Sequence, residues 1–60
     1  MICVSDLVKT LKNNIIIIID LGPDENNIAR QVIYYEKEHG HLIIDKIYFA
    51  DEKNIGIKVL

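Results

Sequence analysis

An acidic residue directly follows the most apolar segment of the chain. Asp20 comes after the run Ile15–Ile19, and the turn sequence Leu21-Gly22-Pro23-Asp24 follows it. Open α/β sheets bind ligands at the carboxyl ends of their parallel strands, next to helix N-termini. Together with Asp51, at the end of the second predicted strand, Asp20 is therefore a candidate for a two-carboxylate Mg²⁺ site. The structural interpretation, in which Asp20 caps the turn, is favoured because no glycine-rich phosphate loop is present.

The two histidines are separated by one glycine, in the sequence His39-Gly40-His41. This spacing allows both imidazoles to bind one metal ion, with Glu36 or Glu38 as a further ligand. A symmetric dimer would bring four histidines together and so complete a tetrahedral site. The favoured alternative is that both histidines lie at the end of a helix, where a positive charge stabilises the C-terminal carbonyl groups. A bound metal or other cofactor is therefore not expected.

Arg30, Tyr34 and Lys37 have the spacing i, i+4 and i+7, which places them on one exposed stripe if the segment is helical. Arginine and tyrosine are enriched among the residues that dominate protein–protein binding, so this stripe is the candidate binding surface. The same side chains suit a nucleic acid, with the cations on phosphates and the tyrosine on a sugar or base. The structural alternative is an ordinary solvated face, with Glu38 paired to Arg30 or Tyr34.

The chain is short for a protein that folds alone. Its 60 residues allow one domain, residues 1–60, and a domain of this size buries only about 60% of the surface that its unfolded chain exposes. Small domains are completed by disulfides, metals, oligomerisation or a very apolar core. Cys3 is the only cysteine, so no disulfide can form within the chain, and a buried, inert thiol is expected. Half of the residues are hydrophobic, which favours an apolar core together with self-association.

Charge and hydropathy disfavour some classes of partner. The net charge is −2, and the sequence has no cluster of lysine and arginine, so binding to a nucleic-acid backbone is not favoured. The longest apolar run, Ile15–Ile19, is far shorter than the roughly 20 residues of a membrane span. A single thiol and the lack of a signal peptide indicate a soluble protein of the reducing cytoplasm.

Two segments are predicted to be helical. Ser5–Lys12 is expected as a short helix, with Ser5 as its N-cap and an apolar edge docked on the rest of the protein. A longer helix is predicted from Pro23, in the first helical position, to His39, with Gly40 after its last residue. The buried stripe of this helix is expected to be formed by Ile28, Ala29, Val32, Ile33 and either Tyr35 or Glu36.

Three segments are predicted to be strands. Five consecutive isoleucines favour an extended backbone, and because they do not alternate with polar residues, Ile15–Leu21 is expected to be a central strand with both faces covered. His41–Ala50 and Asn54–Leu60 are expected to form an antiparallel hairpin. The helix between the first two strands makes these a right-handed parallel crossover. The sequence thus predicts an α+β fold of α-β-α-β-β order, with a three-stranded mixed sheet and the long helix on one face.

The two faces of the predicted sheet differ in polarity. One face is apolar except for Asp45. The other face is mixed, with Ile16, Ile18, Leu42, Ile44, Tyr48 and Leu60 beside Asp20, Lys46, Gly56 and Lys58. A second copy of the chain is the simplest cover for such a face, so a homodimer is expected to complete the fold.

Three functions remain open, in the following order. The favoured one is a small, non-enzymatic, homo-oligomeric binding or regulatory module. It would contact an unidentified protein through the stripe of Arg30, Tyr34 and Lys37, or through an open sheet edge. The second is a nucleic-acid-binding protein whose dimer pairs the basic faces of two helices. The third is a metal-dependent enzyme with an intersubunit site formed by Asp20, Asp51 and the histidines.

Overall fold

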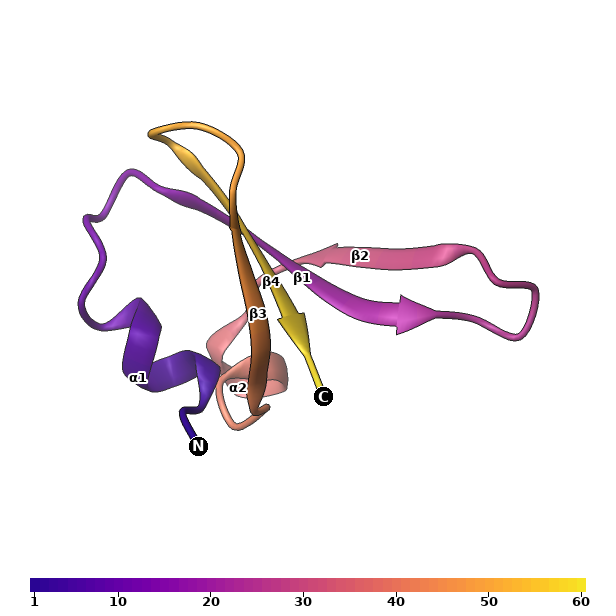
Figure 1. The fold of residues 1–60 in the computed structure, drawn as a ribbon. Coiled ribbons are helices and arrows are strands. Elements are labelled where there is room, and N and C mark those ends of the chain that lie inside the picture. Colours follow the sequence, from indigo (N-terminus) through magenta and orange to yellow (C-terminus); the bar gives the residue numbers. More distant parts are fainter.

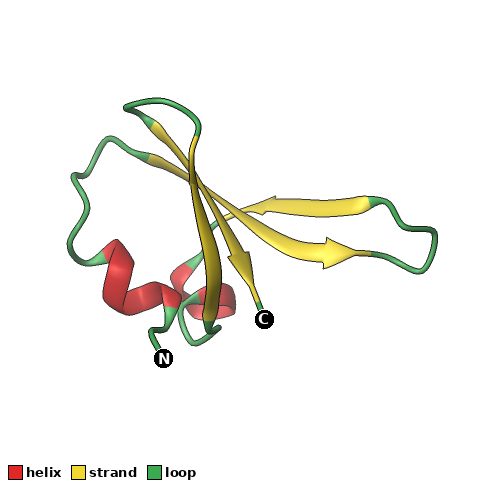
Figure 2. Ribbon diagram, in the orientation of Figure 1, coloured by secondary structure: helices red, strands yellow, loops and turns green.

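The computed structural model describes residues 1–60 as a four-stranded sheet with two short helices (Figure 1). In chain order, the elements are α1 (Val4–Val8), β1 (Ile16–Pro23), β2 (Ala29–Ile33), α2 (Glu36–His39), β3 (Ile44–Phe49) and β4 (Asn54–Val59). The α+β class predicted from the sequence is confirmed, while the three-stranded sheet and the long helix are wrong. The two helices lie close to each other, and the β1–β2 hairpin extends away from them (Figure 2).

β1 is a central strand, as its isoleucine run predicts. The strand order is β2-β1-β4-β3, so β1 is hydrogen-bonded on both edges. Its neighbour β2 is antiparallel, whereas β4 is parallel and places Ile57 beside Ile19. The last two strands form the predicted antiparallel hairpin. The expected parallel crossover from β1 to the next strand is wrong, because the parallel partner of β1 is the last strand of the chain.

The predicted helix from Pro23 to His39 is replaced by a hairpin strand and a single helical turn, α2. β-branched and aromatic residues are frequent in this segment, and such residues fit a pleated sheet better than a helix. Val32 is half-buried while its neighbours Gln31 and Ile33 are exposed. A period of two therefore describes the segment, although its apolar residues also fit the helical period.

The turn of this hairpin is built by Asp24 and Asn27. The Asp24 carboxylate accepts hydrogen bonds from the backbone N–H groups of Asn26 (2.8 Å) and Ile28 (3.0 Å). Asn27 adopts a positive φ of 62°, a conformation that asparagine tolerates better than most residues. The acidic residue that would stabilise a helix N-terminus therefore closes a turn instead.

A bulge in β1 lies opposite Arg30. The register of β1 and β2 shifts between Asp20 and Pro23, where Leu21 and Gly22 lie opposite this single residue. The Asp20 carboxylate accepts a hydrogen bond from the Gly22 N–H (2.8 Å). The Arg30 guanidinium donates to the carbonyl groups of Leu21 and Gly22 (3.0 and 3.1 Å). Side chains from both strands thus bind the backbone groups that the bulge removes from regular pairing.

α1 packs against the core and is tied to α2. Val4 is fully buried and Leu7 packs beside it, which confirms the docked apolar edge of this helix. The helix begins at Val4 with Cys3 in the N-cap position, so the predicted cap at Ser5 is wrong. The Ser5 hydroxyl donates instead to the Glu36 carboxylate of α2 (2.6 Å). Neither helix has the length and apolar character that crossing a membrane requires.

The core lies on one face of the sheet. Its buried side chains are Val4, Ile19, Ile55, Ile57 and Val59. Asp45 does not interrupt this apolar face, because it is the extra residue of a second bulge, between Ile44 and Lys46 of β3. Ile44 therefore packs on the core, as Leu42 does, although simple alternation puts both on the mixed face. Asp45 forms an ion pair with Lys58 of β4.

Gly22→Ala should destabilise the fold through backbone strain. A Cβ atom at this position would meet nothing within 4 Å, but the φ of +86° suits only glycine well, and the strain is expected to be about 1–2 kcal/mol. Asn27→Gly is the control, because it places glycine at a second positive φ and should preserve stability. Urea unfolding followed by circular dichroism measures both variants. A Gly22→Ala protein as stable as the wild type would contradict the strained bulge.

Candidate functional site

The face of the sheet opposite the core is uncovered, and we call it the open face. By strand register its residues are Ile16, Ile18, Asp20, Gln31, Ile33, Lys46, Tyr48, Asn54, Gly56 and Lys58. Ile16, Ile33 and Tyr48 are 51, 55 and 49% exposed. The expectation that both faces of β1 are covered is therefore wrong within one chain, because the short helices cover only the core face.

An apolar row crosses the middle of the open face. Strand register places Ile33, Ile18, Gly56 and Tyr48 side by side, one from each strand. Gly56 has no side chain, so the row has a gap between Ile18 and Tyr48. A groove of about 270 Å³ opens there, lined by these three residues and their neighbours. The Tyr48 ring lies beside the gap, since a Cβ atom on Gly56 would be 3.7 Å from Tyr48 Cδ2.

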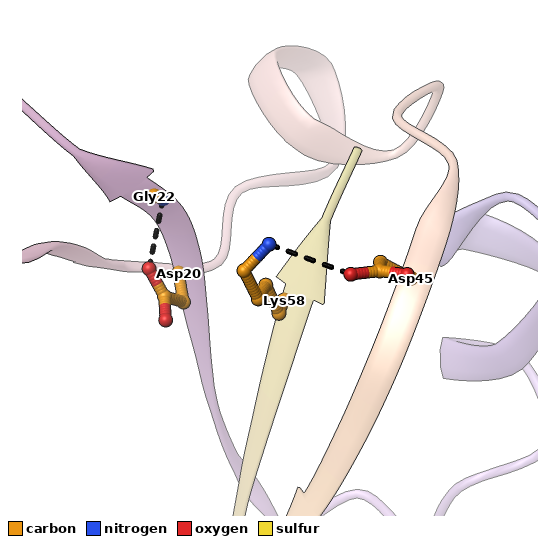
Figure 3. Close-up of polar contacts among 4 residues, drawn as sticks. All are labelled: Asp20, Gly22, Asp45 and Lys58. Atoms are coloured by element: carbon orange, nitrogen blue, oxygen red, sulfur yellow. Dashed lines mark hydrogen bonds and ion pairs between the residues drawn. The ribbon is translucent and has the colours of Figure 1, made fainter.

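A charged row follows the apolar row, two residues further along β1 and β4. Asp20, Lys58 and Lys46 are register neighbours on β1, β4 and β3. Figure 3 shows Lys58 between Asp20 and Asp45, with its Nζ atom 3.4 Å from Oδ2 of Asp45. Both side chains of this ion pair are about a third exposed, so the pair stabilises the fold by at most about 1 kcal/mol. Asp45 is the fourth charged group of this row, so two carboxylates and two ammonium groups make it neutral.

The predicted binding stripe does not exist as a helical surface. Arg30 lies on β2, where its guanidinium is hydrogen-bonded to the carbonyl groups of the β1 bulge. Tyr34 lies between β2 and α2 and is half-buried, while Lys37 lies in α2 and is exposed. The three residues come from three different elements because the helix that would align them is absent. A role for them in binding stays a prediction.

Glu36 connects α1, α2 and the segment that follows β2. Its carboxylate accepts hydrogen bonds from the hydroxyl groups of Ser5 and Tyr34. These bonds, that of Ser5 first, hold the pKa of Glu36 below its usual value. Partial burial and the bond to Glu36 raise the pKa of Tyr34 to about 12. The phenol therefore stays protonated and the carboxylate stays ionised at neutral pH.

The two carboxylates considered for a Mg²⁺ site lie apart. Asp20 caps the bulge of β1, which is the structural role favoured from the sequence. Asp51 lies in the β3–β4 turn, where hydrogen bonds from Lys53 N–H (2.8 Å) and from Asn54 lower its pKa. Because Asn54 pairs with Ile16 at the start of β1, the two carboxylates lie at opposite ends of the β1–β4 ladder.

The two histidines and the cysteine have separate surroundings. His39 is 6% exposed, and its Nδ1 atom accepts a hydrogen bond from the Tyr35 N–H (2.9 Å), so its ring is a structural part of α2. His41 is exposed. Cys3 is half-buried rather than buried, and its thiol donates to the Asp6 carboxylate (3.2 Å). No three histidine, cysteine, aspartate or glutamate side chains come close enough together to hold a metal ion.

The residues that shape the open face can be found only in part from the sequence. Alternation along the strands correctly assigns Ile18, Tyr48 and Gly56 to one face. Ile33 is missed, because the helical period places it on a buried stripe, whereas in β2 it lies beside Ile18 and is exposed. The sequence signal for the hairpin that exposes Ile33 is the segment Asp24–Asn27, because acidic and asparagine residues in succession favour a turn.

No protein-family model, curated protein or solved structure matches the chain. The geometry of the open face is therefore the basis on which a function is inferred.

Acid should destabilise the protein through Glu36. Its pKa is lower in the folded chain than in the unfolded chain, where it is about 4.3. Its contribution to stability is therefore complete above the unfolded-state pKa and is lost as the pH falls through the folded-state pKa. Glu36→Gln should lower the free energy of unfolding at neutral pH and flatten its decline in acid.

Chemical denaturation at a series of pH values measures this effect. Glu25→Gln is the matched control, because it makes the same chemical change at an exposed position of the hairpin turn. A Glu36→Gln variant with the same acid dependence as the wild type would show that the Ser5 and Tyr34 bonds do not stabilise the fold.

Proposed function

We propose that this chain is a small, non-enzymatic binding module that acts through protein–protein contacts of its open face. The observation that carries the proposal is the apolar row of Ile33, Ile18, Gly56 and Tyr48 on an uncovered sheet face. The charged row borders it on one side. Protein interfaces combine an apolar centre, enriched in aromatic residues, with a polar rim in the same way.

The exposure of the apolar side chains supports a protein as the partner. Ile16, Ile33 and Tyr48 leave about half of their surface in water, whereas Ile19 and Ile57, at the centre of the core face, are fully buried, and Phe49 at the edge of that face is exposed. Burial of apolar surface contributes about 25 cal/mol per Å², so a partner that covers these side chains gains free energy. Tyr48 also suits the centre of an interface, because its ring offers a large contact area and its hydroxyl can still donate a hydrogen bond.

We do not propose a second function. Nucleic-acid binding by paired helices requires a basic helical face, and the Arg30 guanidinium is instead bound within the hairpin. The metal site formed by Asp20, Asp51 and the histidines has no support within one chain, where Asp20 and Asp51 lie at opposite ends of the β1–β4 ladder.

Ile33→Glu should weaken protein binding and leave the fold intact. A charge placed in the apolar row would have to lose water when a partner covers it. Ile28→Glu is the matched control, because Ile28 has a similar exposure (61% against 55%) but lies in the hairpin turn, outside the open face. The measurement uses tagged forms of the wild type and of both variants in the cells in which the chain is found. Proteins crosslinked to each tagged form are captured, and their amounts are compared.

At least one protein, either a second copy of the chain or a different protein, should be captured by the wild type and by Ile28→Glu. Its amount should fall at least about tenfold with Ile33→Glu. Tyr48→Ser, on the opposite edge strand, repeats the test independently of any folding defect that Ile33→Glu introduces, and circular dichroism checks each variant. Equal capture by all four proteins would contradict the proposed function.

A further inference from the structure

The accessible surface of the chain is larger than that of a compact monomer. It is 4591 Å² for a mass of 6.9 kDa, whereas a compact monomer of this mass exposes about 4,000 Å². The excess of about 600 Å² approaches the roughly 800 Å² that each partner contributes to a standard interface. A partner of similar size buries an area of this order.

The apolar row of the open face is complementary to itself. Ile18 on β1 is the register neighbour of the gap at Gly56 on β4, and these two strands form the middle of the sheet. A two-fold axis parallel to the strands, midway between β1 and β4, would place β1 of one copy over β4 of the other. Ile18 of each copy would then lie over the partner's Gly56. At the edges of the row, Ile33 would lie over the partner's Tyr48.

The charged row is complementary under the same rotation. Across β2, β1, β4 and β3 its register positions are Gln31, Asp20, Lys58 and Lys46, and Asp45 beside them is paired with Lys58 of its own chain. The rotation would place Asp20 of each copy over the partner's Lys58, and Gln31 over the partner's Lys46. Stacked sheets lie about 10 Å apart and cross at about 30°, a separation that a lysine side chain can bridge. Opposite charges would face each other on both sides of the axis, which favours correct pairing.

A two-fold axis perpendicular to the strands, passing through the apolar row, would give a poorer fit. It would place each strand over its own copy, so that the two Gly56 gaps would face each other and leave a void. It would also place Ile16 over the partner's Asp20, whose carboxylate would lose water against an apolar side chain. The axis parallel to the strands avoids both problems.

We propose that the partner of the open face is a second copy of this chain, in a two-fold symmetric sandwich with β1 of each copy over β4 of the other. This inference rests on the proposed function, because it gives the identity of the partner at the same surface and the arrangement of the contact. In the sandwich, Ile18 fills the partner's groove and Asp20 pairs with the partner's Lys58. The dimer buries the face of β1 that the single chain leaves open.

Substitutions of Ile18 and of Gly56 test this geometry. Ile18→Ala removes the side chain that fills the groove, and Gly56→Val fills the groove itself. The single chain accommodates the added Cβ atom, whose nearest contact would be 3.6 Å away at Tyr48 Cβ. Light scattering and a dilution series should show a dimer for the wild type and for Ile28→Glu. Each of the two groove variants should dissociate at least about tenfold more readily.

A mixture of the two variants separates contacts between chains from contacts within one chain. Ile18 and Gly56 are also neighbours in the same chain, so a double variant alone would not distinguish them. In a heterodimer of Ile18→Ala with Gly56→Val, one contact is the native one, and in the other the alanine makes room for the valine. Native mass spectrometry with one chain isotopically labelled should therefore find the heterodimer in excess of its statistical share.

Two results would overturn the two-fold arrangement: a wild-type chain that stays monomeric at several hundred micromolar, or a mixture without excess heterodimer. If either occurs while Ile33→Glu still loses a captured protein, the second-copy inference fails and the proposed function stands. If capture also does not depend on the open face, both fail.

Discussion

The parallel pairing of β1 with β4 is the interaction on which the rest of the structure depends. Apart from this ladder, the sheet consists of two hairpins, β1–β2 and β3–β4, each closed by its own turn. The ladder places the buried side chains of Ile19 and Ile57 next to each other at the centre of the core. The short helices cover the part of this face around these residues and leave Phe49, at its β3 edge, 74% exposed. They are too short to cover the other face as well, and this leaves a surface for a partner.

The sequence predicts the elements that have strong local signals. Five consecutive isoleucines indicate the central strand, and a polar loop between two apolar runs indicates the β3–β4 hairpin. The segment from Asp24 to Tyr35 has no such signal, because its apolar residues fit both a period of 3.6 and a period of two. Tertiary pairing decides between the two periods, since Val32 lies opposite the buried Ile19 and packs on the core.

The sequence predicts that this sheet face mixes apolar and polar residues, but it does not predict the groove on the face. Alternation separates the two faces of a strand, whereas the side-by-side placement of Ile18 and Gly56 depends on strand register, which a single sequence does not supply. Residues chosen for their chemical type have structural roles here. Asp20 and Arg30 both bind the backbone groups of the β1 bulge, and this role depends on a register shift that the sequence alone does not reveal.

The strand order also has a consequence for how the chain folds. Each hairpin joins residues that are close in sequence, and hairpins form within about 1–10 μs. The parallel ladder joins Ile17 to Ile55, and closing so long a segment reduces conformational entropy before its contacts form. We therefore expect the docking of the two hairpins to limit the folding rate. Until that step, the isoleucines of β1 have one unpaired edge, and this is the segment through which unfinished chains would aggregate.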